Sequence, residues 1–539
     1  MRDPIQIPLI ETESSWAPPS LLPDLTRATE IAVDLETRDP NLLLLGPGWA
    51  TNDGEVVGVS LATNDWSGYL PFKHEAGGNL DKGFVMAWLK KQMDSPADKI
   101  FHNSLYDVGW LKREGIEIQG KIQDTMIAAP LINENRHRYS LDSLGFEYCG
   151  DRKDETLLKQ AAKDWGVNPK AEMWKLPSKY VGPYAEQDAV LTLKLWNKMK
   201  PVLEKQNLGA IYALESGILP LLIEMRWRGI KIDQDKAQKT MDQLKVKEEQ
   251  TIQQIKKDYG FGIDLWAAAS LAKVFDKVSL TYPRTERTNA PSFTAQWLES
   301  HTHPLPQAIV KARKLNKLRT TFIEKMIFGH MRNGKIHGQI NPLRSDNGGT
   351  VSGRFSYSSP NLQQVPARDP ELGRLVRDLF IPDGQEYWGA FDYSQQEPRI
   401  TVHYAALTKQ LGAEEAVEAY QDQDADFHQI VADMAGIDRK KAKTINLGLS
   451  YGMGKQKLTQ ALDIPGPEAE ALFAQYHKKV PFIKGLSNSC MRRASNKGFI
   501  TTLLGRKCRF NMYEARNENS IPLSYEQAVE KWGKEDLVR

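Results

Sequence analysis

Residues 389–400 read GAFDYSQQEPRI. The apolar and aromatic residues at the start of this stretch predict a β-strand that delivers Asp392 to a turn. Hydroxyl, amide, carboxylate and guanidinium side chains follow at once, a combination that suits a metal ion and a phosphate. Phosphoryl transfer with two metal ions usually needs a second carboxylate beside the first. The sequence therefore raises the question of which acid accompanies Asp392.

Length and composition indicate a multidomain globular protein. A chain of 539 residues is too long for one hydrophobic core, so we expect about three domains. No run of about 18 apolar residues is present, and the N-terminal residues 1–16 lack the continuous apolar stretch of a signal peptide. Three cysteines without a CxxC pair argue against disulfides and a zinc ribbon. We expect a cytoplasmic protein without a membrane partner.

The first two hundred residues alternate strand-like and helix-like segments. EIAVDLET (30–37) and VVGVSLAT (56–63) are typical of buried strands, and KIFHN (99–103) leads into a helix. A long helical pattern over 183–206 follows. These patterns predict an α/β domain that ends near residue 206.

The rest of the chain is mostly helical. Residues 234–330 predict an exposed arm of two helices, and the Gly, Ser, Asn and Pro residues of 345–366 predict loops. After the GAFDYS strand we expect helices over about 398–490 and a β-hairpin, KGFITTLLGRKCRF, over 497–510.

Four acids and a tyrosine in the first domain form one candidate metal site. Asp34 and Glu36 lie two residues apart in one strand, so they share a face. Asp107 and Asp188 fall in helical segments, and Tyr184 lies one turn before Asp188. Each residue alone is more simply explained as a cap or a surface side chain. Together they could hold Mg²⁺ ions that activate a water, which Tyr184 could orient.

The order of these segments carries more weight than any single acid. VDLET, HNSLYD and YxxxD, on a strand and two helices, closely resemble the three motifs of proofreading 3′→5′ exonucleases. The resemblance covers about residues 28–205. It implies a ribonuclease H-like exonuclease domain with two Mg²⁺ ions, or Mn²⁺, on Asp34, Glu36, Asp107 and Asp188.

The remaining sequence resembles the family A DNA polymerases. SGRFSYSSPNLQQVP (352–366) is similar to a family loop, which implies that Arg354 lies near the primer terminus. The same match places Asn361 and Gln363 near template or primer. FDYSQQEPR (391–399) is similar to a second family motif.

This second motif implies several roles. Asp392 and the carbonyl of Tyr393 would be metal ligands, and Glu397 would be the steric gate that excludes a ribose 2′-hydroxyl. Arg399 would contact DNA. Pro398, where the family usually has Leu, suggests a helix-start position because of its fixed φ and missing N–H.

A third match, RKKAKTINLGLSYGMG (439–454), looks like the fingers helix of the family. Its functional residues recur every four positions and form one stripe. A cationic start suits a triphosphate, and the apolar and aromatic continuation suits a base. The upstream His428 matches a histidine that reaches the phosphates. The match assigns the nucleotide to His428, Arg439, Lys443, Leu447 and Tyr451; Leu447 stands where Phe or Tyr is usual.

The resemblance predicts a multidomain α/β protein: an exonuclease domain followed by the thumb, incomplete palm and fingers of a right-hand polymerase. The expected ranges are exonuclease 1–206, linker and thumb 207–335, first part of the palm 336–405, fingers 406–490 and incomplete palm re-entry 491–539.

The partner of Asp392 is missing from its expected place. Family members end with a His-Asp-Glu hairpin whose Asp is the second metal ligand, but none of the ten histidines here precedes an Asp. Glu535 and Asp536 lie in a charged tail that we expect to form a solvated terminal helix. Either the chain is cut or a second polypeptide completes the palm. We favour the second polypeptide.

The leading hypothesis is a proofreading DNA polymerase that acts on primer-template DNA and dNTPs. If a phage encodes it, we expect it in the cytoplasm of the host cell. A stand-alone 3′→5′ exonuclease with a DNA-gripping region is the alternative, and a catalytically silent DNA-binding scaffold is a third. The intact acids of the first domain argue against the scaffold. A region that only binds duplex DNA needs neither a triphosphate site nor a ribose gate. The presence of Glu397, Arg439 and Lys443 therefore argues against the stand-alone exonuclease.

Overall fold

The computed structural model describes residues 8, 12–260, 262, 264–346, 348–367, 369, 372–421, 426, 428–429, 432–433, 437–462, 464–516 and 520–538. The chain forms two compact units, Met1–Trp388 and Gly389–Arg539. In the described residues no helix is both long and apolar enough to cross a bilayer. The five domain ranges expected from the sequence stay predictions.

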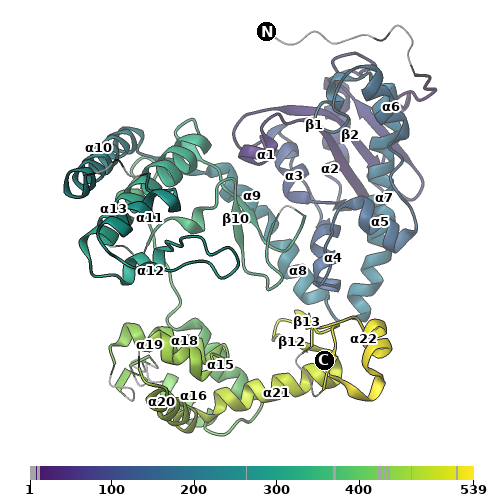
Figure 1. The fold of residues 1–539 in the computed structure, drawn as a ribbon. Coiled ribbons are helices and arrows are strands. Elements are labelled where there is room, and N and C mark those ends of the chain that lie inside the picture. The colour runs from purple at the N-terminus through teal and green to yellow at the C-terminus, as the bar shows by residue number, and fades with distance from the viewer. Residues whose placement is uncertain are drawn as a thin grey trace. The chain divides into compact units, whose positions relative to one another are not determined.

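A five-stranded mixed sheet forms the centre of the N-terminal part of the first unit (Figure 1). Its order is β3-β2-β1-β4-β5, with β1 antiparallel to β2 and parallel to β4. The strands are β1 Glu30–Arg38, β2 Glu55–Ala62, β3 Ser67–Pro71, β4 Asp98–Phe101 and β5 Ile122–Asp124. The strands predicted from residues 30–37 and 56–63 are confirmed, as is the strand-to-helix change after residue 99.

Helices cover this sheet, and α7 packs along β1, β2, β3 and β4 (Figure 1). The long helix predicted over 183–206 is therefore present, although it begins five residues earlier. The helices are α1 Leu42–Leu45, α2 Lys82–Met93, α3 Ser104–Arg113, α4 Thr125–Ile132, α5 Leu141–Cys149, α6 Thr156–Asp164, the 3₁₀ turn Met173–Lys175, α7 Ser178–Lys205, α8 Gly209–Gly217 and α9 Leu219–Arg228.

The helical arm after residue 234 is larger than predicted. The expectation of two helices is wrong, because the described residues form α10 Gln234–Tyr259, α11 Ala268–Lys277, α12 Ala295–Ser300, α13 Pro304–Lys317 and a π-helix, Leu318–Phe328. Phe275, Phe293 and Leu298 are buried in a small core of their own together with residues of α10 and α13. The shorter helices α11 and α12 carry Phe275 and Leu298, and they pack with α10 and α13 because this removes the apolar side chains from water.

Short strands complete the first unit. The sheet β11-β6-β8-β7 uses Phe380–Ile381, Ile230–Ile232, Lys335–Ile336 and Met331–Arg332. The loop region predicted for 345–366 contains one short strand, β10 Ser356–Ser358, which pairs with β9 Gln339–Asn341. A 3₁₀ turn, Leu362–Gln364, and helix α14, Leu372–Arg377, follow.

The second unit is mainly helical. Its described elements are α15 Gln396–Leu407, α16 Ala413–Gln421, α18 Arg439–Ser450, α19 Lys455–Leu462, α20 Gly466–Lys479, α21 Pro481–Lys497, β12 Phe499–Thr501, β13 Lys507–Arg509, β14 Glu514–Ala515, α22 Tyr525–Trp532, the 3₁₀ turn Lys534–Asp536 and β15 Leu537–Val538. The predicted hairpin is confirmed, because β12 and β13 pair antiparallel. The tail is not purely helical: β15 pairs with β14, and the exposed Glu535 and Asp536 lie just before β15.

The strand predicted for GAFDYS is wrong. Residues 389–393 have no regular secondary structure, and Phe391 and Tyr393 are 98% and 79% exposed. A strand needs a neighbour for its backbone hydrogen bonds, and no strand among the described residues pairs with this segment. Its alternating apolar residues therefore have no core to face.

Candidate active sites

Strand β1 directs Asp34 and Glu36 to the same face of the sheet. Val33 and Leu35 alternate with them and are buried in the core on the opposite face. Across the ladder Asp34 pairs with Ser60 and Glu36 with Gly58, and the register shifts just after Glu36. Such an irregularity re-aims side chains beside functional sites. The two acids are thus held by a central strand, which is a rigid support.

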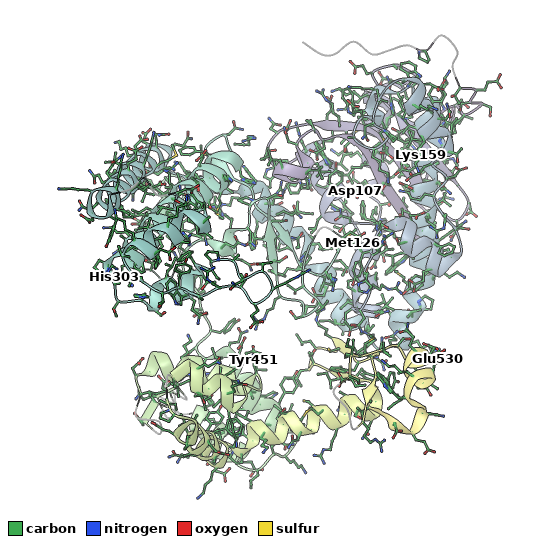
Figure 2. All side chains as sticks on the ribbon, viewed as in Figure 1. Asp107, Met126, Lys159, His303, Tyr451 and Glu530 are labelled. Carbon is green, nitrogen blue, oxygen red and sulfur yellow. The ribbon has the colours of Figure 1, made fainter. Side chains whose placement is uncertain are left out.

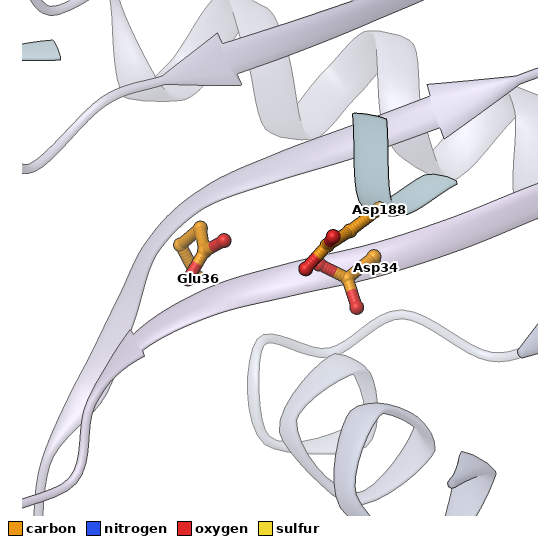
Figure 3. A group of neighbouring side chains, drawn as sticks. All are labelled: Asp34, Glu36 and Asp188. Carbon is orange, nitrogen blue, oxygen red and sulfur yellow. The ribbon is translucent and has the colours of Figure 1, made fainter. Parts of the chain in front are cut away.

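Helix α7 adds Asp188 to the pair. The carboxylate oxygens of Asp34, Glu36 and Asp188 lie within 4.8 Å of one another, as Figure 3 shows for the three side chains. Asp188 and Glu36 are buried, while Asp34 is half-buried. Three of the four predicted acids therefore form one group that could hold a cation.

The fourth predicted acid, Asp107, lies in the first turn of α3 (Figure 2). Asp124 fixes the start of this helix, because its carboxylate accepts hydrogen bonds from the amides of Asn103 and Ser104, at 3.1 and 2.7 Å. Asp107 is buried and accepts a hydrogen bond from the backbone of Leu35. It stands outside the three-acid group but next to the strand that carries it.

Burial gives these acids unusual proton affinities. Burial and the charge of Asp188 raise the pKa of Asp34 to about 7. Burial and the carboxylate of Asp34 raise the pKa of Glu36 and that of Asp107 well above their usual range. Burial and Asp188 also raise the pKa of Tyr184, so its hydroxyl stays protonated and can donate. Groups with such shifts gather at functional sites.

The group suits a hard divalent cation. Its donors are all carboxylate oxygens, which Mg²⁺ and Mn²⁺ prefer. The Oδ1 atom of Asp188 is buried and has no hydrogen-bond partner among the described residues. A buried anionic oxygen without a partner is costly, so a cation is the natural complement.

One positively charged side chain in this site, that of Lys153, was not predicted from the sequence. Lys153, in the loop between α5 and α6, places its Nζ 2.5 Å from Asp188 Oδ2 and donates to the Tyr184 hydroxyl at 2.9 Å. Although burial opposes its charge, Asp188, Asp34 and Glu36 raise the pKa of Lys153. Lys153 belongs to none of the three sequence motifs, so only its place in a short charged loop, RKDE, could have pointed to it.

In the second unit, helix α18 presents the predicted nucleotide stripe to solvent. Arg439 and Lys443 are exposed and Leu447 is half-buried, whereas Ala442, Ile445 and Leu449 are buried in the core. Tyr451, labelled in Figure 2, follows the end of the helix and is 72% exposed.

Tyr451 contacts the predicted ribose gate. Its hydroxyl donates to Glu397 Oε2 at 3.0 Å. Glu397 lies in the first turn of α15, whose third residue is Pro398, so the predicted helix-start position of this proline is confirmed. Asp392 and Tyr393 are exposed just before this helix, and within the described ranges no acid group like that of Asp34 includes Asp392.

A buried polar chain lies behind the stripe. Tyr476 donates to Asn446 Oδ1 at 2.7 Å, and Asn446 Nδ2 lies 3.2 Å from His428 Nδ1. All three side chains are buried. Burial lowers the pKa of His428. The positive charges of Arg439 and Lys443 lower it further, whereas the negative charge of Asp426 opposes the shift. Asn446 and Tyr476 were missed, because buried partners of a site residue leave no periodic signal.

Arg439 and Arg399, which are predicted to bind nucleotide and DNA, contact other residues of the second unit. Arg439 forms an ion pair with Asp426. Arg399, predicted to bind DNA, donates to the carbonyls of Ser394 and Tyr420 at 3.0 and 3.2 Å and lies over the Tyr420 ring. Arg399 thereby joins α15 to the end of α16.

The predicted primer-template residues lie in the first unit. Asn361 caps a 3₁₀ turn by accepting from the Gln363 amide at 3.1 Å. The Gln363 side chain donates to the carbonyl of Phe355 at 2.9 Å, and Arg354 is exposed in the same loop. These bonds give the loop a defined shape, and the DNA contacts stay predictions.

Known protein families and phage proteins are similar to both parts of this chain. The sequence pattern of the family described as DNA polymerase family A matches residues 234–530, and that of a 3'-5' exonuclease matches residues 13–204. A DNA-directed DNA polymerase of Pseudomonas phage M6 is 39% identical over 94% of this chain and 85% of its own length. DNA polymerase DpoZ of Acinetobacter phage SH-Ab 15497 is 31% identical, with 90% and 83% covered.

A cellular relative and a solved structure extend this picture. DNA polymerase I of Pseudomonas aeruginosa is 27% identical over 92% of this chain but only 54% of its own length. The POL domain of Pol1 from M. smegmatis, solved with DNA primer-template and dNTP, superposes with a TM-score of 0.70 at 22% identity. That comparison covers 90% of this chain and 79% of the other, and it shows a shared fold.

Proposed function

The chain belongs to DNA polymerase family A and carries a 3′–5′ exonuclease domain, and from this premise we propose that it extends primer-template DNA with dNTPs and removes mispaired 3′ ends. The exposed stripe on α18 carries the polymerase proposal, and the three-acid group carries the exonuclease proposal. A phage polymerase would act in the host cytoplasm.

In the exonuclease site, Asp34, Glu36, Asp107 and Asp188 would hold two Mg²⁺ ions, or Mn²⁺. When bound, these ions would make a water nucleophilic and stabilise the leaving oxygen of the phosphodiester. The protonated Tyr184 hydroxyl would orient the attacking water. The burial of the acids supports this role, because charge stabilisation is strongest where bulk water is excluded.

In the polymerase site, Arg439 and Lys443 would bind the triphosphate of the dNTP, with His428 as a third donor. Leu447 and Tyr451 would face the base, and Glu397 would exclude a 2′-hydroxyl. Arg439, Lys443 and Leu447 lie on one face of α18, and this placement supports the assignment. The hydrogen bond from Tyr451 to Glu397, in the first turn of α15, also supports it. Asp392 and the Tyr393 carbonyl would hold metal ions. Arg354, Asn361, Gln363 and Arg399 would contact primer-template DNA.

We also propose that a second polypeptide supplies the second metal-binding carboxylate of the polymerase site, because within the described ranges no group of acids like that of Asp34 includes Asp392. Residues 389–393 support this proposal, since their apolar side chains are exposed and their backbone has no strand partner among the described residues. Without a second acid, extension should fall by about three orders of magnitude or more.

Primer extension with Mg²⁺ and dNTPs tests the polymerase proposal. We expect weak extension by the chain alone and strong extension when the product of the neighbouring gene is added. Strong extension by the chain alone would reject the two-polypeptide proposal but support polymerase activity. If neither preparation extends a primer while 3′ ends are still degraded, the alternative of a stand-alone exonuclease is favoured.

A further inference from the structure

The loop that carries Lys153 is fixed to the helices of the exonuclease site on both sides of this residue. Gln187, next to Asp188 on α7, donates to the carbonyl of Arg152 at 3.0 Å and accepts from the amide of Asp154 at 2.7 Å. The amide of Lys153 donates to Asp142 on α5 at 3.0 Å. The position of the Lys153 side chain is therefore built into the fold.

The Lys153 side chain lies against one member of the acid group, Asp188. It is 14% exposed, and its Nζ contacts both Asp188 and Tyr184. The ammonium also lies 4.6 Å from the centre of the Tyr184 ring, which adds a cation–π attraction. A lysine is rarely buried without a paired charge, and here the pair is one of the predicted metal ligands.

Two consequences follow from this placement. Nζ pairs with Asp188 Oδ2 and leaves Oδ1 without a partner, so a divalent cation that binds Asp188 through Oδ1 is repelled by a nearby positive charge, and one that binds through Oδ2 must displace Nζ. The Tyr184 oxygen accepts from Nζ and keeps its own proton, so the lysine restricts the direction in which this phenol can donate.

We propose that Lys153 is a resident counter-cation of the exonuclease site that lowers its affinity for divalent metal and positions the Tyr184 hydroxyl. The inference rests on the proposed exonuclease function. In this proposal Lys153 is a positioning residue, because it acts through Asp188 and Tyr184.

Mn²⁺ binding to the full chain without DNA tests the first role, with free Mn²⁺ followed by electron paramagnetic resonance. The Asp34→Ala variant is the control for Mn²⁺ that binds elsewhere on the chain. We expect Lys153→Met and Lys153→Ala to bind Mn²⁺ at the site about fivefold more tightly or better, because a repelling charge is removed. Lys153→Arg keeps the charge, and Lys163→Met changes an exposed lysine of α6, so both should match the unaltered chain.

Degradation of single-stranded DNA at saturating Mn²⁺ tests the second role. Lys153→Met should lower kcat by about tenfold or more with KM nearly unchanged, and Lys153→Arg should restore part of kcat. Unchanged or weaker Mn²⁺ binding by both Lys153→Met and Lys153→Ala would overturn the counter-cation role. An unchanged kcat would overturn the positioning role. Degradation that persists in Asp34→Ala would instead reject the proposed exonuclease site.

Discussion

Tyr451 donates a hydrogen bond to Glu397 at 3.0 Å and so joins the end of α18 to the first turn of α15. The residue predicted to exclude a ribose hydroxyl is held in place by a residue predicted to face the base. Sugar and base selection should therefore be coupled through this bond.

Glu397→Ala should relax sugar selection. Its removal leaves space where a 2′-hydroxyl would meet the carboxylate, so the preference for dNTP over rNTP should fall about tenfold or more. The measurement is stabilisation of a complex with a chain-terminated primer-template by the matching dNTP or rNTP, which requires no chemistry. Tyr451→Phe keeps the ring and loses only the bond, so it should have a smaller effect in the same direction. An unchanged preference in Glu397→Ala would exclude the gate role.

Asn446→Ala should weaken both the fold of the second unit and its nucleotide binding. The change leaves the Tyr476 hydroxyl and His428 Nδ1 buried without their partner, which should cost about 1–3 kcal/mol of stability. If Asn446 acts through His428, its effect on dNTP binding should not add to that of His428→Ala in a double-mutant cycle. Fully additive effects would show that the two residues act separately.

The stability of the metal-free exonuclease domain should fall as pH rises from about 5 to 8. Folded Asp34 keeps its proton up to a pKa of about 7, whereas the unfolded chain loses it near the ordinary value of 3.8. In this window the folded state binds more protons, so the free energy of unfolding decreases with pH. The raised pKa values of Glu36 and Asp107 act in the same direction. Burial lowers the pKa of His74 to about 4 and that of His102 to about 3, which opposes the decrease below the ordinary value of 6.5, so the decrease is steepest above it.

Thermal unfolding in a chelator between pH 5 and 8 measures this effect. Mg²⁺ should restore Tm at pH 8, because it binds only the folded site. Asp34→Asn should raise Tm at pH 8 in the chelator and reduce its pH dependence. A Tm that rises with pH throughout this window would contradict the assignment.

Binding of primer-template DNA should weaken steeply with salt, since phosphate contacts release counterions. Arg354→Ala should reduce the slope of log affinity against log salt by about one if Arg354 contacts a phosphate. Arg332→Ala, on β7 of the same unit, is a control at another basic residue. An equal slope for the Arg354 variant and the unaltered chain would remove Arg354 from the DNA interface.

The sequence predicted those features that depend on the regular spacing of residues within one strand or one helix. Alternation along β1 places Asp34 and Glu36 on one face, and a spacing of four places Tyr184 beside Asp188 and aligns Arg439, Lys443 and Leu447. These features depend on one element each. The sequence therefore identified three members of the acid group and the exposed stripe of α18.

Features that depend on distant partners were missed. The GAFDYS strand has the right composition but no neighbour among the described residues, and strand formation requires one. Lys153 enters the acid group because Gln187 ties its loop to α7, and Asn446 matters because Tyr476 packs behind it. Such pairings arise in three dimensions and leave no regular spacing in the chain.

We propose that one chain carries two separable sites, an exonuclease site at Asp34 and Glu36 and a nucleotide site on α18. The most direct test is to replace Asp34 and Glu36 with Ala together and to measure two activities of the same preparation. We expect degradation of single-stranded 3′ ends to fall by about a thousandfold or more, while dNTP still stabilises the primer-template complex as in the unaltered chain. Degradation that persists, or nucleotide binding lost along with it, would contradict the claim.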